Sequence, residues 1–160
     1  ILIFVTLGSQ KFQFNRLLKE IDRLIEEKKI TEEVFVKIGY SDYKPKNYRY
    51  KEFLDREEFS EIMSKCDKFI THGGTGAIIT AVKNGKKVIA IPRLKEFNEH
   101  VDNHQLQIID EFKKMGYIQA IKDIDELEIM ILSMLKFKNK IYISNTLNIM
   151  KCIDDFIRKV

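Results

Sequence analysis

The sequence has few of the residues that mark fibrous, disordered or disulfide-linked chains. Its 160 residues include no Trp, 2 Pro, 2 Cys and 7 Gly. So little Pro and Gly excludes a collagen-like or low-complexity chain. Hydrophobic residues make up 44% of the chain, which is enough for one core at this length. Cys66 and Cys152 form no disulfide framework, which indicates a reducing compartment. We therefore expect a single domain over residues 1–160.

Long apolar runs are also missing. No stretch approaches the roughly 20 residues that a transmembrane helix needs. The opening run, residues 1–5, is too short for the apolar region of a signal peptide, and no basic segment precedes it. We therefore expect the chain to be cytoplasmic.

The positive charge is concentrated at the C-terminal end. The net charge of +4 arises entirely within residues 136–160, where Asp154 and Asp155 are outnumbered by Lys136, Lys138, Lys140, Lys151, Arg158 and Lys159. This segment alternates basic and apolar residues before an amphipathic helix expected over residues 145–160. The pattern predicts docking on a partner, with contact to anionic lipid or a plain solvated face as the alternatives.

Apolar periodicity predicts strands that alternate with helices. Strands are expected over residues 1–7, 34–38, 48–53, 68–71, 87–91 and 117–120. Helices are expected over 14–25, from Asp55, over 77–83, for about 14 residues from His100, from Asp123 and over 145–160. This alternation predicts an α/β fold, a Rossmann-like parallel sheet with helices on both faces. Ligands of such folds bind at the carboxyl ends of strands, which draws attention to loops 8–13, 72–76 and 92–104.

The most informative loop is the glycine-rich turn His72-Gly73-Gly74-Thr75-Gly76. Absent side chains let an anion approach the backbone N–H groups of the following helix, and a diphosphate suits such a site. The alternative is a tight turn that needs glycine for positive φ. The turn lacks the Gly-Lys-Ser/Thr ending of a P-loop, and the acidic residue of a dinucleotide fingerprint is also missing.

Two other loops offer polar groups. Gly8 and Ser9 follow the first strand and could contact a sugar or phosphate. Four short polar side chains at a helix start suit the hydroxyls of a sugar: Asp102, Asn103, His104 and Gln105. His100 and His104, at i and i+4, raise the alternative of a zinc site, but the His-Glu-x-x-His order is absent and no third ligand is evident.

Together these loops resemble the C-terminal, donor-binding half of glycosyltransferase family 28. The residues that carry the likeness are GSQ, THGGTGAIITAVKNGKKVIAIP and EHVDNHQ, within roughly residues 1–110. Within the family, the chain looks like the small subunits of two-part transferases. These include bacterial subunits of capsule and exopolysaccharide assembly and the eukaryotic cytosolic subunit that makes dolichol-linked chitobiose. The resemblance implies one half of a GT-B glycosyltransferase.

The resemblance also implies roles for particular residues. The UDP diphosphate would be held by Gly73, Gly74, Thr75, Gly76 and Ala77, with Gly8 and Ser9 closing over it. The donor sugar would be held by Asp102, Asn103, His104 and Gln105. Relatives often have a Glu that bonds the ribose four residues after the turn. Thr80 stands there in this chain and cannot make a bidentate carboxylate contact.

The implied reaction transfers a hexose from a UDP-sugar to a polyprenyl-linked acceptor, with no metal or other cofactor. Helix N-terminal amides, with His72 or Lys side chains, would stabilise the leaving group. A membrane-associated partner subunit would supply the acceptor site and would hold this chain at the inner face of the plasma membrane. The catalytic base would belong to the partner or be His72, for which a structural role is the alternative.

Three other functions remain open at this point. The chain could be a non-catalytic binding or activating subunit, or a nucleotide-dependent oxidoreductase. Basic and aromatic residues alternate over 40–53, as in some proteins that bind single-stranded nucleic acid. No RNA-binding motif accompanies them, so an edge strand or a partner surface is the favoured interpretation of that segment.

Overall fold

The computed structural model describes residues 1–8 and 10–137. Ser9 lies outside the described residues. So do residues 138–160, which contain the expected last helix and almost all of the basic segment.

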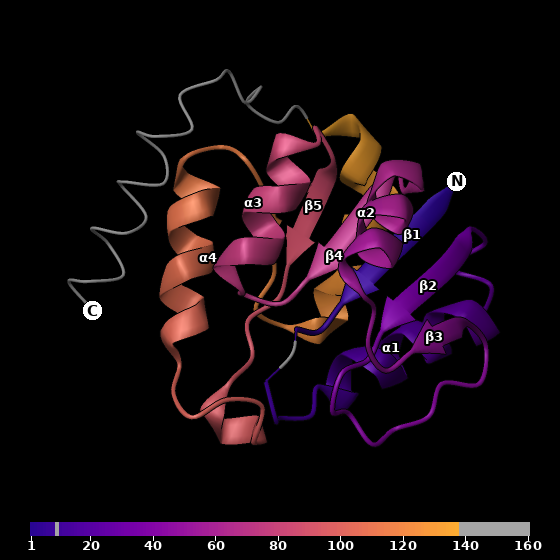
Figure 1. Ribbon diagram of the computed structural model, residues 1–160, viewed down its shortest axis with the longest axis horizontal. Coiled ribbons are helices and arrows are strands. Elements are labelled where there is room, and N and C mark those ends of the chain that lie inside the picture. The colour runs from indigo at the N-terminus through magenta and orange to yellow at the C-terminus, as the bar shows by residue number, and fades with distance from the viewer. Residues whose placement is uncertain (9, 138–160) are drawn as a thin grey trace.

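Six parallel strands form one sheet, in the order β3-β2-β1-β4-β5-β6 (Figure 1). They are β1 (Leu2–Thr6), β2 (Glu33–Lys37), β3 (Arg49–Lys51), β4 (Lys68–Thr71), β5 (Lys87–Ala90) and β6 (Gln119–Ala120). The chain builds outward from β1 to β3 and then returns to β4, on the other side of β1. The strand order therefore reverses between β1 and β4. In open α/β sheets, ligands bind outside the carboxyl ends of the strands at such a point.

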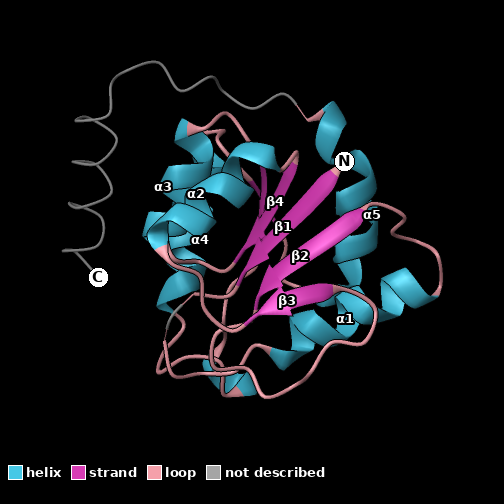
Figure 2. Cartoon of the chain, turned by 45° about the vertical axis from the view of Figure 1, so that its right-hand side comes forward, coloured by secondary structure: helices cyan, strands magenta, loops and turns pink. Residues whose placement is uncertain are grey.

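Helices cover both faces of the sheet (Figure 2). One face is packed by α1 (Asn15–Glu26) and α5 (Leu127–Ser133), and the other by α2 (Arg56–Lys65), α3 (Thr75–Lys83) and α4 (His104–Lys114). Strand β1 serves both cores because its side chains alternate: Ile3 and Val5 pack towards the first layer and Phe4 towards the second. The predicted Rossmann-like parallel sheet with helices on both faces is confirmed.

Several expected boundaries are wrong. The helix expected from His100 begins at His104, because Asp102 Oδ1 accepts from the His104 N–H at 2.9 Å and holds the preceding residues in a loop. The third helix starts at Thr75 rather than at residue 77. The helix from Asp123 begins as a 3₁₀ turn over Ile124–Glu126, and the strand expected over 117–120 is only Gln119–Ala120.

The segment over residues 40–53 contains an edge strand, although it is shorter than the expected 48–53 and covers only Arg49–Lys51. Among the described residues, β3 pairs only with β2 and lies at the end of the sheet. Two of the tyrosines in this segment are used inside the fold, because Tyr43 Oη donates to Asp22 at 2.6 Å and Tyr48 Oη donates to Leu18 O at 2.9 Å. These internal roles remove much of the argument for a nucleic-acid surface.

A loop, rather than a helix, joins β2 to β3, and Asp22 of α1 anchors it. The Asp22 side chain is buried and accepts hydrogen bonds from Tyr43 Oη and from the backbone N–H groups of Lys46 and Asn47. A carboxylate can satisfy three donors at once, and an amide in its place would turn a donor towards them. One buried carboxylate thus fixes how the edge of the sheet approaches the core.

Substitution Asp22→Asn is expected to lower the free energy of unfolding by about 1–3 kcal/mol, because buried N–H donors lose their acceptor. Tyr43→Phe removes only one of the donors and should cost about 1 kcal/mol. Urea unfolding measures both losses. If Asp22→Asn is no more damaging than Tyr43→Phe, the loop does not depend on the carboxylate.

Candidate functional site

The candidate site lies where the strand order reverses. Gly8 follows β1, His72 follows β4, and a hollow of about 410 Å³ lies beside them. It is lined by Thr6, Gly8, Lys37, Phe59, His72, Gly74, Gly76, Ala77 and Thr80. The site thus combines residues far apart in the sequence at the carboxyl edge of the sheet.

The glycines of the turn are not explained by positive φ. Among the described residues, the glycines with positive φ are Gly8, Gly39, Gly85 and Gly116, none of which lies in the turn. Close packing explains two of the turn glycines: a Cβ on Gly73 would lie 2.5 Å from Gln105 Cβ, and one on Gly74 would lie 2.2 Å from His72 Cε1. The alternative of a turn that needs glycine for positive φ is therefore wrong.

Gly76 has a different environment. A Cβ added there would meet nothing within 4 Å among the described residues, and the position lines the hollow. Nothing in the described fold requires glycine at this position. A residue without a side chain leaves room for a ligand to reach the backbone.

The N-terminus of α3 presents donors that have no partner among the described residues. Its N-cap is Gly74, and no side chain among the described residues caps it. Along the helix, the first backbone N–H that has a carbonyl acceptor is that of Ile78, which donates to Gly74 O at 3.2 Å. The N–H groups of Thr75, Gly76 and Ala77 precede it and are the orphan donors of a first helical turn. Such a terminus attracts anions through its N–H groups and its dipole.

His72 is a neutral imidazole at the edge of this hollow. Burial, together with the nearby charges of Arg93 and Lys37, lowers its pKa from 6.5 to about 3, although a hydrogen bond with Gln105 opposes the shift. His72 Nδ1 lies 3.2 Å from Gln105 Nε2. Its other ring nitrogen, Nε2, lies close to Gly8, where an added Cβ would approach it to 2.6 Å.

Gln105 connects the loops after β4 and β5. Its side-chain oxygen accepts from Gly73 N at 2.9 Å and from Arg93 N at 3.0 Å. The residue is only 5% exposed. These bonds fix the side-chain amide, and with it the group that contacts His72.

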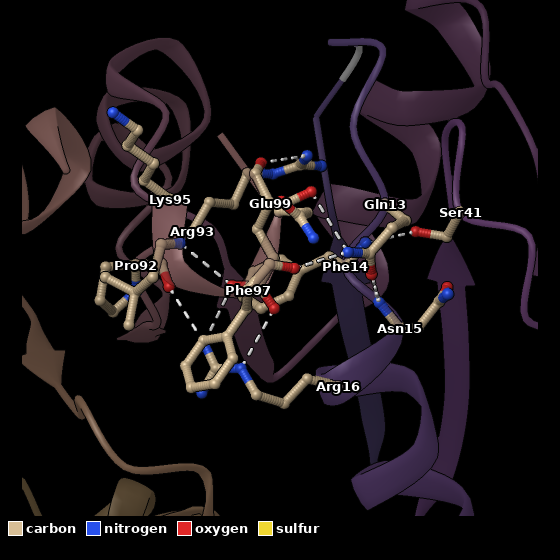
Figure 3. Close-up of polar contacts among 12 residues, drawn as sticks. Gln13, Phe14, Asn15, Arg16, Ser41, Pro92, Arg93, Lys95, Phe97 and Glu99 are labelled. Atoms are coloured by element: carbon tan, nitrogen blue, oxygen red, sulfur yellow. Dashed lines mark hydrogen bonds and ion pairs between the residues drawn. The ribbon is translucent and has the colours of Figure 1, made fainter. Parts of the chain in front are cut away.

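Buried charges hold the loops after β1 and β5 together (Figure 3). Arg93 is 1% exposed and donates to the backbone oxygens of Leu7, Phe12 and Glu99. Glu99 is fully buried and accepts from both Arg16 Nε and a terminal Arg16 nitrogen at 3.1 Å. Arg93 thereby fixes the backbone immediately before Gly8.

The structure brings together most of the predicted diphosphate residues. Gly8, Gly74, Gly76 and Ala77 line one hollow with His72, and Gly73 lies behind it against Gln105. Thr80, the predicted ribose contact, also lines the hollow, and its hydroxyl donates to Gly76 O at 2.8 Å. It can therefore offer a ligand only its acceptor lone pairs.

The predicted sugar-binding residues are more dispersed. Of these four, only Gln105 contacts His72. Asp102 Oδ1 lies 3.1 Å from His100 Nδ1, Asn103 Oδ1 accepts from Lys95 N at 2.9 Å, and His104 begins α4. Asn103 lines a second hollow, of about 440 Å³. Their role in sugar binding stays a prediction.

Two residues of the site were missed from the sequence. Lys37 ends β2 and lines the hollow, where burial lowers the pKa of its ammonium group. A basic residue at the end of the apolar run Val34-Phe35-Val36 was the available signal. Arg93 follows Pro92 and resembles an ordinary surface arginine, so nothing in the sequence indicates its burial.

The described residues contain no group of three or more His, Cys, Asp or Glu placed to hold a metal ion. His100, one half of the considered zinc pair, has its Nδ1 beside Asp102. In the described part of the chain, no helix is both long and apolar enough to span a membrane.

The depressed pKa of His72 predicts a pH-dependent stability. The unfolded chain takes up a proton at this residue near pH 6.5, whereas the folded chain does so only near pH 3. The contribution of the neutral ring to the free energy of unfolding is therefore fully present above pH 6.5 and is lost as the pH falls towards 3. Between these values the wild type should lose up to about 1.4 kcal/mol per pH unit more than His72→Gln. Urea unfolding at several pH values measures this, and equal slopes for both proteins would contradict it.

Comparison with known protein families gives a match over almost the whole chain. The model of the glycosyltransferase family 28 C-terminal domain matches residues 2–157. The UDP-N-acetylglucosamine transferase subunit ALG13 of Candida glabrata is 37% identical over 54 residues, which are 34% of this chain and 25% of that protein. The protein of the same name from Candida albicans is 30% identical over 76 residues, or 46% of this chain and 25% of that protein. The matched stretches thus span about a quarter of these relatives.

Solved structures share the fold. A solution structure of ALG13 superimposes with a TM-score of 0.62, at 16% identity, over 94% of both chains. The crystal structure of the glycotransferase of kitacinnamycin gives a TM-score of 0.62 at 16% identity, over 98% of this chain and 38% of that one. The sheet and its helices are those of the C-terminal, Rossmann-like domain of GT-B glycosyltransferases.

Proposed function

Because the chain belongs to the glycosyltransferase family 28 C-terminal domain family, we propose that it is the donor-binding subunit of a UDP-sugar-dependent hexosyltransferase. The observation that carries the proposal is the hollow beside α3. It combines a helix N-terminus that no described side chain caps, a glycine against which no described residue packs, and the basic Lys37. These groups suit an anion with several oxygens, and the diphosphate of a nucleotide sugar is such an anion.

The same groups would promote transfer. When the sugar leaves, negative charge develops on the diphosphate, and positioned N–H donors together with an ammonium group stabilise it. This chain would supply that stabilisation through its own residues, without a metal. The base for the acceptor hydroxyl would then be sought across the cleft, on another subunit.

A partner subunit forms the second part of the proposal. The fold is that of one half of a GT-B enzyme, and the named relatives are described as subunits of a transferase. The partner would supply the acceptor site and the base for the acceptor hydroxyl, and it would do so at the membrane. We place the acceptor among polyprenyl-linked sugars of capsule or exopolysaccharide assembly, on the cytoplasmic side.

The basic segment 136–160 is the proposed docking element for the partner subunit. The name of the relatives makes UDP-N-acetylglucosamine the first donor to test.

Calorimetry with UDP tests donor binding directly. The chain, alone or with its partner, should bind UDP with a saturable isotherm. Lys37→Met should weaken binding about tenfold or more, because a hydrogen bond to a charged group contributes about 1.5–3 kcal/mol. Lys83→Met removes the same charge from the exposed far end of α3 and should leave the affinity unchanged. If UDP binds neither to the chain alone nor to the chain with its partner, the proposed function is contradicted.

Transfer is tested with the co-expressed partner and a panel of UDP-sugars. The complex should release UDP from one donor in the presence of a polyprenyl-linked acceptor, and His72→Phe should reduce turnover more than it reduces complex formation. A complex that keeps its full activity when this chain can no longer bind UDP would show that the chain only activates its partner.

A further inference from the structure

The side-chain amide of Gln105 can adopt only one orientation. Its oxygen lies 2.9 Å from Gly73 N and 3.0 Å from Arg93 N, and both of these backbone groups are donors. Turning the amide by half a rotation would place its NH₂ group against two backbone N–H groups, at a side chain that is only 5% exposed to water. Because buried polar groups need partners, the oxygen must face the backbone. The NH₂ group must therefore face His72.

The orientation of Gln105 fixes the tautomer of His72. An amide NH₂ group only donates, so His72 Nδ1, at 3.2 Å, must accept and carry no proton. A neutral imidazole has one N–H, which is then on Nε2. Among the described residues, Nε2 has no hydrogen-bond partner, and it lies beside Gly8, on the side of the ring that meets the hollow.

We propose that Gln105 is a positioning residue that holds His72 as an Nε2–H donor for the ligand's diphosphate, so that His72 acts as a neutral electrophile and not as a base. The identity of the ligand rests on the proposed function, whereas the tautomer does not. A neutral donor suits this position, because Lys37 and Arg93 already place positive charge near the ring. The lone pair that a base would need is on Nδ1, where Gln105 occupies it.

This role differs from the sugar contact implied by the family resemblance. A residue that only contacts the sugar would affect UDP-sugar binding and leave UDP binding unchanged. A residue that acts through His72 would also affect binding of UDP itself. Binding of UDP to Gln105 variants therefore separates the two roles.

The test uses Gln105→Glu, which keeps an acceptor for Gly73 N and Arg93 N. Its second carboxylate oxygen can only accept from His72 and should move the ring proton to Nδ1. At about pH 8.5, well above the ordinary histidine pKa of about 6.5, NMR of the ring nitrogens should show the proton on Nε2 in the wild type and on Nδ1 in the variant. UDP affinity should fall about tenfold or more. Gln107→Glu, the same change at an exposed position of α4, should leave both unchanged.

A double variant separates the tautomer from the added charge. In a His72→Phe background, Gln105→Glu should cause no further loss of UDP affinity, because the group it acts through is gone. A wild-type ring protonated on Nδ1 would overturn the proposal. So would a Gln105→Glu protein whose ring is protonated on Nδ1 and which binds UDP as tightly as the wild type. The proposal would also fail if Gln105→Glu lowered UDP affinity equally in the presence and in the absence of His72. If the wild type binds no UDP, the proposed function fails, and the NMR result still decides whether Gln105 sets the tautomer.

Discussion

The site depends on one buried amide oxygen, that of Gln105, which holds the loop after β4 against the loop after β5. Gln105 Oε1 accepts from the first glycine after β4 and from the residue after Pro92, and it does so from the first turn of α4. The glycine is required because a Cβ there would collide with Gln105. Three elements that are separate in the sequence thus meet at one acceptor. Because buried polar groups are costly to leave unpaired, the arrangement is fixed before any ligand arrives.

The third loop of the site is held by a different set of buried groups. Arg93 donates to three backbone oxygens on the loops after β1 and β5, and Glu99 pairs with Arg16 of α1. Burial and the nearby Glu99 act on Arg93 in opposite directions, and burial prevails, so its pKa falls to about 10 and the guanidinium remains charged at neutral pH. These interactions place Gly8 against the ring of His72. The hollow is therefore bordered by preorganised donors, the condition under which electrostatic stabilisation of a leaving group is effective.

Much of the fold was predictable from local sequence patterns. Buried parallel strands are continuous apolar runs, and the Asp55 capping box is visible as Asp-x-x-Glu, so the presence of the strands and the start of α2 followed from short-range rules. The start of α4 was wrong because Asp102 uses its side chain to cap a loop, and periodicity does not detect such competition. The glycine-rich turn was found from its composition, and the structure shows which of its glycines serve packing.

The deeper residues of the site were not predictable, because their roles depend on contacts between distant loops. Arg93 and Glu99 resemble surface charges in the sequence, and only the fold buries them. Lys37 was assigned to a strand, and its neighbours in space, His72 and Gly76, come from the other side of β1. Gln105 was assigned to sugar binding from the polar cluster at a helix start and from the family resemblance, whereas its contacts to backbone N–H groups arise only when the loops after β4 and β5 come together.

The most direct test of the central claim is an NMR titration of the isotope-labelled chain with UDP, following each backbone amide. The account predicts saturable shifts at Gly74, Thr75, Gly76 and Ala77, together with Lys37, and no comparable change in α5 on the opposite face of the sheet. Saturable shifts confined to the second hollow around Asn103, or no change at the start of α3, would contradict it.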